Sequence, residues 1–197
     1  MKTKIAKSIG VTTTIAAALF AASSFAQAIK VAQVVELSGG GTAAGTQYRN
    51  GAKLAIAEIN AAGGIMGKKI EVLEMDTQSQ PAIAKAMTVK AIDEKVTAIF
   101  GPVFSGSILV SQTESQKAAI PNFTGGEASN VTAQGNPYIF RSSFNQSMGM
   151  PKVAAYMAGD LKAKTVTVAY VNNDFGKGGR DAIIKELGAR GIKVAAD

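Results

Sequence analysis

The chain has 197 residues, of which 47% are hydrophobic, and it carries a formal net charge of +7. This length allows one ordinary domain or two small ones with a substantial core. Because the chain contains no Cys, His or Trp, it lacks the residues for a Ser-His-Asp or Cys-His nucleophile pair and for a usual tetrahedral zinc site. No basic stripe with interleaved aromatic residues occurs, so the composition does not favour nucleic-acid binding.

Residues 1–28 have the three parts of a secretory signal peptide. Lysines within the first seven residues form a basic start, residues 9–22 are largely apolar, and Ala-Gln-Ala at 26–28 is a small-residue cleavage site. The apolar part is shorter than the roughly 20 residues that span a bilayer. The pattern therefore predicts export of the protein and cleavage after Ala28.

Strands and helices alternate along the chain after this segment. The spacing of apolar residues predicts strands over 29–37, 69–76, 97–100, 120–123 and 138–141, and helices over 48–61, 81–95 and 107–118. Strands that alternate with helices of this length are typical of βαβ units. The sequence therefore predicts an α/β fold with a parallel sheet.

The alternation begins again after a polar stretch near residues 141–147. The later elements are predicted as helices over 150–161 and 181–189 and strands over 165–171 and 192–195. The polar stretch is typical of a crossing between structural units. We therefore divide the chain into units at 29–144 and 145–197, the second ending at a strand with no element after it.

Ligands in open parallel sheets bind beyond the carboxyl ends of the strands. The loops at such positions cover residues 38–46, 101–107, 124–130 and 172–179. Three of them lead into helices, whose free N–H groups favour an anion. Together the loops predict a site for a small carboxylate or phosphate.

The first of these loops contains three successive glycines and fits a dinucleotide-binding turn only loosely. Gly39, Gly41 and Ala44 match G-x-G-x-x-G/A, but the acid that ends the second strand, Asp76, lies well beyond the expected spacing. The sequence G-K-[ST] of a Walker phosphate loop does not occur. We therefore expect no nucleotide cofactor, and the glycines serve either a turn or the close approach of a ligand.

Side chains in the later loops are candidates for ligand contact. Ser105 and Ser107 stand where a helix begins, so one is expected to cap it and the other to bind a carboxylate. Glu127 is an acid among small residues, and it is either solvated or a partner for an ammonium or hydroxyl group. Phe175 is a large ring in a polar loop that either covers a ligand or packs into its own unit.

Five blocks of sequence occur in a characteristic order. They are IKVAQVVELSGG, NGAKLAIAEINAAGGIMGKKIEVLEMDTQSQPAIA, AIFGPVFSGS, AAIPNFTGGEASNVTAQGNPYIFRSSFNQS and VTVAYVNNDFGKGG. Together they resemble the periplasmic solute-binding proteins of the branched-chain amino-acid type, which feed ABC importers. The resemblance implies a two-lobed periplasmic-binding-protein type I architecture, with parallel sheets flanked by helices and a cleft that closes on a small carboxylate. It also implies a periplasmic location, a permease of the inner membrane as partner, and no enzymatic activity, cofactor or metal.

The resemblance implies roles for individual residues in this cleft. Ser105 matches the serine whose hydroxyl meets the ligand carboxylate, and Phe175 matches an aromatic residue that covers the ligand from the second lobe. The segment 126–128 matches the one that binds the carboxylate and the amino group. The complete set of expected ligand contacts is Ser38, Phe104, Ser105, Gly126, Glu127, Ala128 and Phe175.

The chain departs from the leucine-binding relatives at two points. Ala44 stands where they carry an aromatic residue, so we expect a different ligand preference. The chain also ends at Asp197 with an incomplete second lobe, which implies a truncated protein that binds ligand weakly or not at all. A ligand-sensing domain of the same fold, coupled to a receptor or regulator, is the alternative function. A secreted hydrolase has little support, because no S-x-x-K sequence follows residue 28 and no acids are placed to work as a pair.

Overall fold

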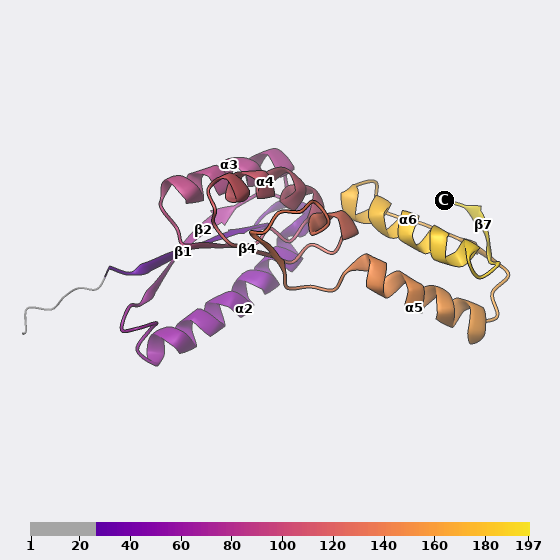
Figure 1. Ribbon diagram of the computed structural model, residues 1–197, viewed down its shortest axis with the longest axis horizontal. Helices are drawn as coiled ribbons and strands as arrows, with labels where there is room; N and C mark the ends of the chain where they lie inside the picture. The colour runs from indigo at the N-terminus through magenta and orange to yellow at the C-terminus, as the bar shows by residue number, and fades with distance from the viewer. Residues whose placement is uncertain (1–26) are drawn as a thin grey trace, which may run out of the picture.

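The computed structural model describes residues 27–197, which form two units connected through residues 142–145 (Figure 1). The predicted export signal therefore lies almost wholly outside the described residues. Within the described part of the chain, no helix is long and apolar enough to cross a membrane.

The first unit is built on a five-stranded parallel sheet with the strand order β2-β1-β3-β4-β5. Its strands are β1 (Ile29–Val35), β2 (Ile70–Asp76), β3 (Ala98–Phe100), β4 (Asn122–Thr124) and β5 (Ile139–Arg141). The chain passes from β1 to β2 on one side and then returns to place β3 on the other side of β1. Ligands bind at such a switch point, beyond the carboxyl ends of the strands. The topology thus directs attention to the segments that follow β1 and β3.

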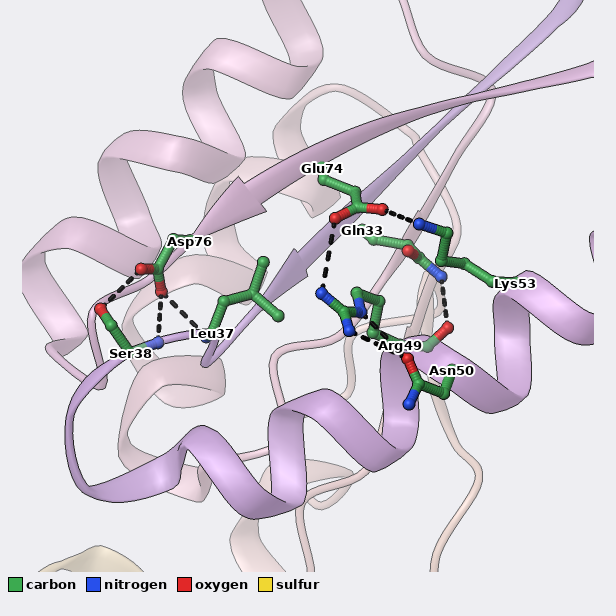
Figure 2. A network of polar contacts seen from close by, with 8 residues as sticks. All are labelled: Gln33, Leu37, Ser38, Arg49, Asn50, Lys53, Glu74 and Asp76. Carbon is green, nitrogen blue, oxygen red and sulfur yellow. Dashed lines mark hydrogen bonds and ion pairs between the residues drawn. The ribbon is translucent and has the colours of Figure 1, made fainter.

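Helices cover both faces of this sheet, as Figure 1 shows. Helix α2 (Thr42–Ala61) lies on one face, and α3 (Pro81–Asp93) and α4 (Ser105–Lys117) lie side by side on the other. The side chains of Arg49 and Lys53 in α2 pair with Glu74 of β2 (Figure 2). The core beneath α3 consists of Ala32, Val34, Met75, Ala91, Val96 and Ile99.

The second unit packs two helices beside a two-stranded parallel sheet. Its elements are α5 (Gln146–Gly159), β6 (Thr165–Thr167), α6 (Asp174–Gly188) and β7 (Lys193–Ala196). Its core contains Ala154, Ile183, Leu187 and Ile192. The predicted α/β class, with parallel strands flanked by helices, is confirmed in both units.

Helix α2 begins six residues earlier than the sequence predicts. A short 3-10 turn, η1 (Gly39–Gly41), leads directly into Thr42, so most of the glycine-rich first loop is helical. Gly45 lies in the part of α2 that the sequence predicts as loop, and a β-carbon there would overlap the backbone of Glu36. The glycine is therefore required for the close approach of α2 to the end of β1.

Helix α6 also begins earlier, at Asp174 instead of residue 181, so the predicted loop 172–179 is mostly helix. Asn173 caps it, because its side-chain Oδ1 accepts the N–H of Gly176 at 2.9 Å. The preceding strand β6 is correspondingly shorter than predicted and ends at Thr167. Phe175 thus lies in the first turn of a helix and not in the predicted polar loop.

Candidate functional site

A cleft of about 620 Å³ lies between the two units, a volume within the roughly 300–1,000 Å³ typical of small-molecule sites. The first unit contributes segments that follow β1, β2, β3 and β4, and the second contributes the start of α6. The lining residues are Gly40, Ser79, Pro81, Val103, Phe104, Ser105, Gly106, Ser107, Gly125, Glu127, Val171, Asn173, Asp174 and Phe175.

The structure brings part of the predicted set together at this cleft. Phe104, Ser105, Glu127 and Phe175 line it. The remaining predicted contacts, which are Ser38, Gly126 and Ala128, are not among the lining residues. Each of these three residues instead contacts other parts of the protein.

Ser38 is held by Asp76, the last residue of β2 (Figure 2). Its hydroxyl donates to Asp76 Oδ2 at 2.6 Å, and the N–H groups of Leu37 and Ser38 donate to Oδ1 at 2.9 and 3.1 Å. Desolvation raises the pKa of Asp76, but the hydrogen bonds from Ser38, Gln78 and Leu37 together hold it below its usual range. Asp76 therefore fixes the turn after β1 as a charged acceptor.

Ser105 is the first residue of α4 and is 2% exposed. The N-cap of α4 is Phe104, which makes no side-chain cap bond, so the expectation that Ser105 or Ser107 caps this helix is wrong. The Ser105 hydroxyl oxygen instead accepts the N–H of Ala128 at 3.2 Å. Because a serine hydroxyl both donates and accepts, its own proton is available to a ligand.

The segment before α4 is positioned by Glu36, a fully buried acid that the sequence analysis did not identify. Its carboxylate accepts the N–H of Val103 at 3.0 Å and that of Phe104 at 3.1 Å. These bonds bind the end of β1 to the entrance of α4 across the switch point. An acid directly after the apolar run of β1 was the signal in the sequence, since such an acid needs buried partners.

The loop after β4 alternates between the cleft and the protein interior. Gly125 and Glu127 line the cleft, whereas Gly126 and Ala128 pack against α4. A β-carbon on Gly126 would overlap Ile108 Cδ1, and Ala128 is 1% exposed in a cluster with Ile108. Burial raises the pKa of Glu127, and the positive charge of Arg141 opposes this rise.

The second unit faces the first turn of α4 with an acid that the sequence analysis also missed. Asp174 lines the cleft, and its Oδ2 lies 2.8 Å from the position that a β-carbon on Gly106 would occupy. In the sequence, Asp174 falls in the predicted loop 172–179, where an acid is normally exposed to solvent. Only the approach of the two units reveals its place opposite α4.

The cleft offers a ligand both side-chain carboxylates and helix N-termini. Its lining includes the carboxylates of Glu127 and Asp174 and no Lys or Arg, and the first turns of α4 and α6 border it. Helix N-termini attract a carboxylate, whereas side-chain carboxylates attract a cation. The arrangement suits a small zwitterion that enters an otherwise apolar site. Residues 27–197 contain no group of three or more acidic, His or Cys side chains that could hold a metal ion.

The chain is similar to known substrate-binding proteins. An amino acid binding protein of Pseudomonas aeruginosa is 32% identical over 158 residues, which are 79% of this chain and 42% of that protein. The Streptococcus pneumoniae branched-chain amino acid transporter substrate binding protein LivJ, solved with isoleucine, has a TM-score of 0.80 and 33% identity over 87% of this chain and 49% of LivJ. A solute binding protein of an R. palustris ABC transporter, solved with 4-hydroxybenzoate, has a TM-score of 0.75 and 28% identity over 86% of this chain and 46% of its own.

The chain spans less than half the length of these relatives. The structural matches confirm the predicted two-lobed type I periplasmic-binding architecture. The model of the periplasmic binding protein family matches residues 28–197. This chain therefore belongs to the periplasmic binding protein family.

Proposed function

We propose that this chain is part of the exported substrate-binding component of an ABC importer, and that the whole protein binds a small α-amino acid in the cleft. The observation that carries the proposal is the cleft lining, in which two acids and two helix N-termini surround apolar side chains. The lobes are taken as 29–144 and 145–197. They close on the ligand in the periplasm, after removal of residues 1–28, and present a joint surface to an inner-membrane permease.

The ligand carboxylate is recognised from the first lobe. The Ser105 hydroxyl donates to it, together with the N–H groups of Gly126 and Glu127. Ala128 acts through Ser105, because its N–H occupies the hydroxyl oxygen and so orients the hydroxyl proton. Ser38 supports the first cleft turn through Asp76. These interactions are stronger in a closed cleft than in water, because closure excludes solvent.

The rest of the ligand is recognised by acids and aromatic rings. Glu127 and Asp174 accept hydrogen bonds from the ligand ammonium. Phe104 of the first lobe and Phe175 of the second contact its apolar side chain. Phe175 is 42% exposed, so contact with a ligand would bury apolar surface and contribute favourably to binding.

The charge of the lining favours an amino acid over an aromatic acid. One structural relative was solved with isoleucine and another with 4-hydroxybenzoate, and these compounds differ in that only the first carries an ammonium group. Two carboxylates without a basic side chain repel a bare carboxylate and attract an ammonium group. The cleft of this chain therefore fits the amino-acid class.

A thermal-shift titration of the whole protein that contains these residues tests the proposal. Isoleucine, leucine, valine and alanine are compared with 4-hydroxybenzoate and with N-acetylisoleucine, which lacks the ammonium charge. A ligand specific to the native state raises the melting temperature, and the rise grows with the logarithm of its concentration relative to its dissociation constant. We expect a saturable rise with an amino acid and none with N-acetylisoleucine. A rise with 4-hydroxybenzoate alone would contradict the assigned ligand class.

A further inference from the structure

We infer that Arg141 is a positioning residue that sets the direction in which the peptide groups of the cleft loop point. The cleft loop is defined here as residues 125–128. Its guanidinium turns the carbonyl groups of this loop toward the crossing between the units, and the loop N–H groups are thereby left for the ligand carboxylate. The last step rests on the proposed function. The orientation of the loop itself does not depend on it.

Three of the four carbonyl groups of the cleft loop accept hydrogen bonds from one side. Arg141 ends β5, and its guanidinium donates to the carbonyls of Gly126 and Ala128, the latter at 2.9 Å, and to Thr132 Oγ1 at 3.0 Å. The carbonyl of Glu127 accepts the N–H of Gln146 at 3.0 Å. Three successive carbonyls therefore accept hydrogen bonds from residues 141–146, and Ser143 reinforces the first of them at 3.2 Å.

The N–H groups of the same loop differ in whether they have an acceptor in the protein. Within residues 27–197, the N–H groups of Gly126 and Glu127 donate to no protein acceptor. The N–H of Ala128 donates to Ser105 Oγ. Buried or half-buried backbone N–H groups are normally paired, so two adjacent unpaired groups beside a cleft indicate a missing acceptor. A ligand carboxylate supplies such an acceptor.

Only an arginine performs this positioning from one side chain. Its planar guanidinium presents several N–H donors in a fixed fork, so it can reach two carbonyls two residues apart and a hydroxyl together. Lysine keeps the charge but loses the fork. The charge has a separate effect, because Arg141 opposes the raised pKa that burial gives to Glu127. The effect of the hydrogen-bonding fork on the loop and the effect of the charge on the pKa of Glu127 can therefore be measured separately.

The test compares Arg141→Lys and Arg141→Met in the whole protein without ligand. The amide hydrogen exchange of Ala128 and Gln146, followed by NMR, is expected to accelerate about tenfold or more in both variants, because each loses hydrogen bonds that keep the loop closed. Arg180→Lys is the matched control, since Arg180 is also partly exposed but contacts Tyr170, Asp181 and Asp197. It is expected to leave both amides unchanged.

A titration of the Glu127 carboxyl by NMR separates positioning from general stability. Arg141→Met should raise the pKa of Glu127 above the wild-type value, and Arg141→Lys should leave it near that value. Unchanged exchange at Ala128 and Gln146 in both Arg141 variants would overturn the inference.

A measurement on the wild-type protein covers the case in which the variants do not fold. Separate, unaveraged Nη signals of Arg141 are expected, because both terminal nitrogens are bonded. Averaged signals would overturn the inference. These readouts need no ligand, so failure of the amino-acid titration with slow Ala128 exchange would reject the proposed function and leave the loop assignment intact.

Discussion

Ser105 serves two partners, and its replacement separates them. In Ser105→Ala the buried N–H of Ala128 loses its acceptor, which costs about 1–3 kcal/mol of unfolding free energy, and the ligand carboxylate loses a donor, which weakens binding by about 1.5–3 kcal/mol. Chemical denaturation and calorimetry with isoleucine measure the two quantities. Ser111→Ala is the control, because Ser111 is buried in the same helix and bonds only to helix carbonyls. It should lower stability and leave the dissociation constant unchanged, and an unchanged constant in Ser105→Ala would remove that residue from the site.

Glu127 should make the protein less stable as the pH rises. Burial raises its folded pKa, so its stabilising contribution is fully present below the unfolded value of about 4.3 and is lost as pH rises through the folded value. The unfolding free energy of wild type minus that of Glu127→Gln should fall over this window. A flat difference in unfolding free energy between wild type and Glu127→Gln from pH 4 to pH 7 would argue against a desolvated carboxyl.

Asp76→Asn gives the opposite expectation, because the folded pKa of Asp76 is lowered and its contribution to the unfolding free energy is lost as pH falls.

At the scale of elements, the contact between the cleft loop and α4 depends on glycine at position 126, which has no β-carbon. Gly126→Ala would place a methyl group against Ile108 Cδ1, whose side chain is packed in a buried cluster, and we expect a loss of about 1–3 kcal/mol in unfolding free energy. Gly51→Ala is the matched control, since Gly51 lies exposed inside α2 with nothing within 4 Å of its β-carbon position. That substitution should stabilise the protein by about 0.5–1 kcal/mol. Equal melting temperatures for the two variants would refute the argument.

Element boundaries were predictable where an apolar run decides them. The strands of the first unit begin and end within about two residues of the predicted bounds, because a buried strand needs a continuous apolar stretch. The starts of α2 and α6 were missed because glycines in their first turns resemble loop sequence. At Gly45 the helix tolerates glycine since tertiary contact with Glu36 requires it, and this contact has no local signature. Intrinsic propensity is overridden there by packing.

The candidate site was predictable to the extent that it depends on strand ends. Ser105 and Glu127 follow β3 and β4, and the rule for parallel sheets places such residues at one edge. Arg141 and Asp174 were not predictable, because their roles arise from contacts across the loop and across the two units. A side chain that bonds a neighbouring carbonyl leaves no spacing pattern in the sequence.

At the scale of the whole molecule, one buried residue, Gln146, connects the two units at the cleft. Gln146 is 1% exposed, its N–H donates to the Glu127 carbonyl at 3.0 Å, and its side-chain Nε2 donates to the carbonyl of Phe175 at 2.9 Å. It therefore holds the cleft loop of the first unit and the first turn of α6 at the same time. Gln146→Leu keeps the backbone bond and removes the one to α6.

We expect Gln146→Leu to loosen the position of α6 relative to the first unit, because the contact of Gln146 with the cleft loop then no longer extends to α6. Because the chain contains no cysteine, spin labels attached at Glu58→Cys in α2 and Lys185→Cys in α6 report only the distance between α6 and the first unit. Pulsed electron paramagnetic resonance should show a broader distance distribution for Gln146→Leu than for the labelled parent. Gln112→Leu is the control, since the side chain of Gln112 bonds Gln134 within the first unit. A distribution as narrow as the parent's would mean that other contacts, such as the approach of Asp174 to α4, suffice to set the width of the cleft.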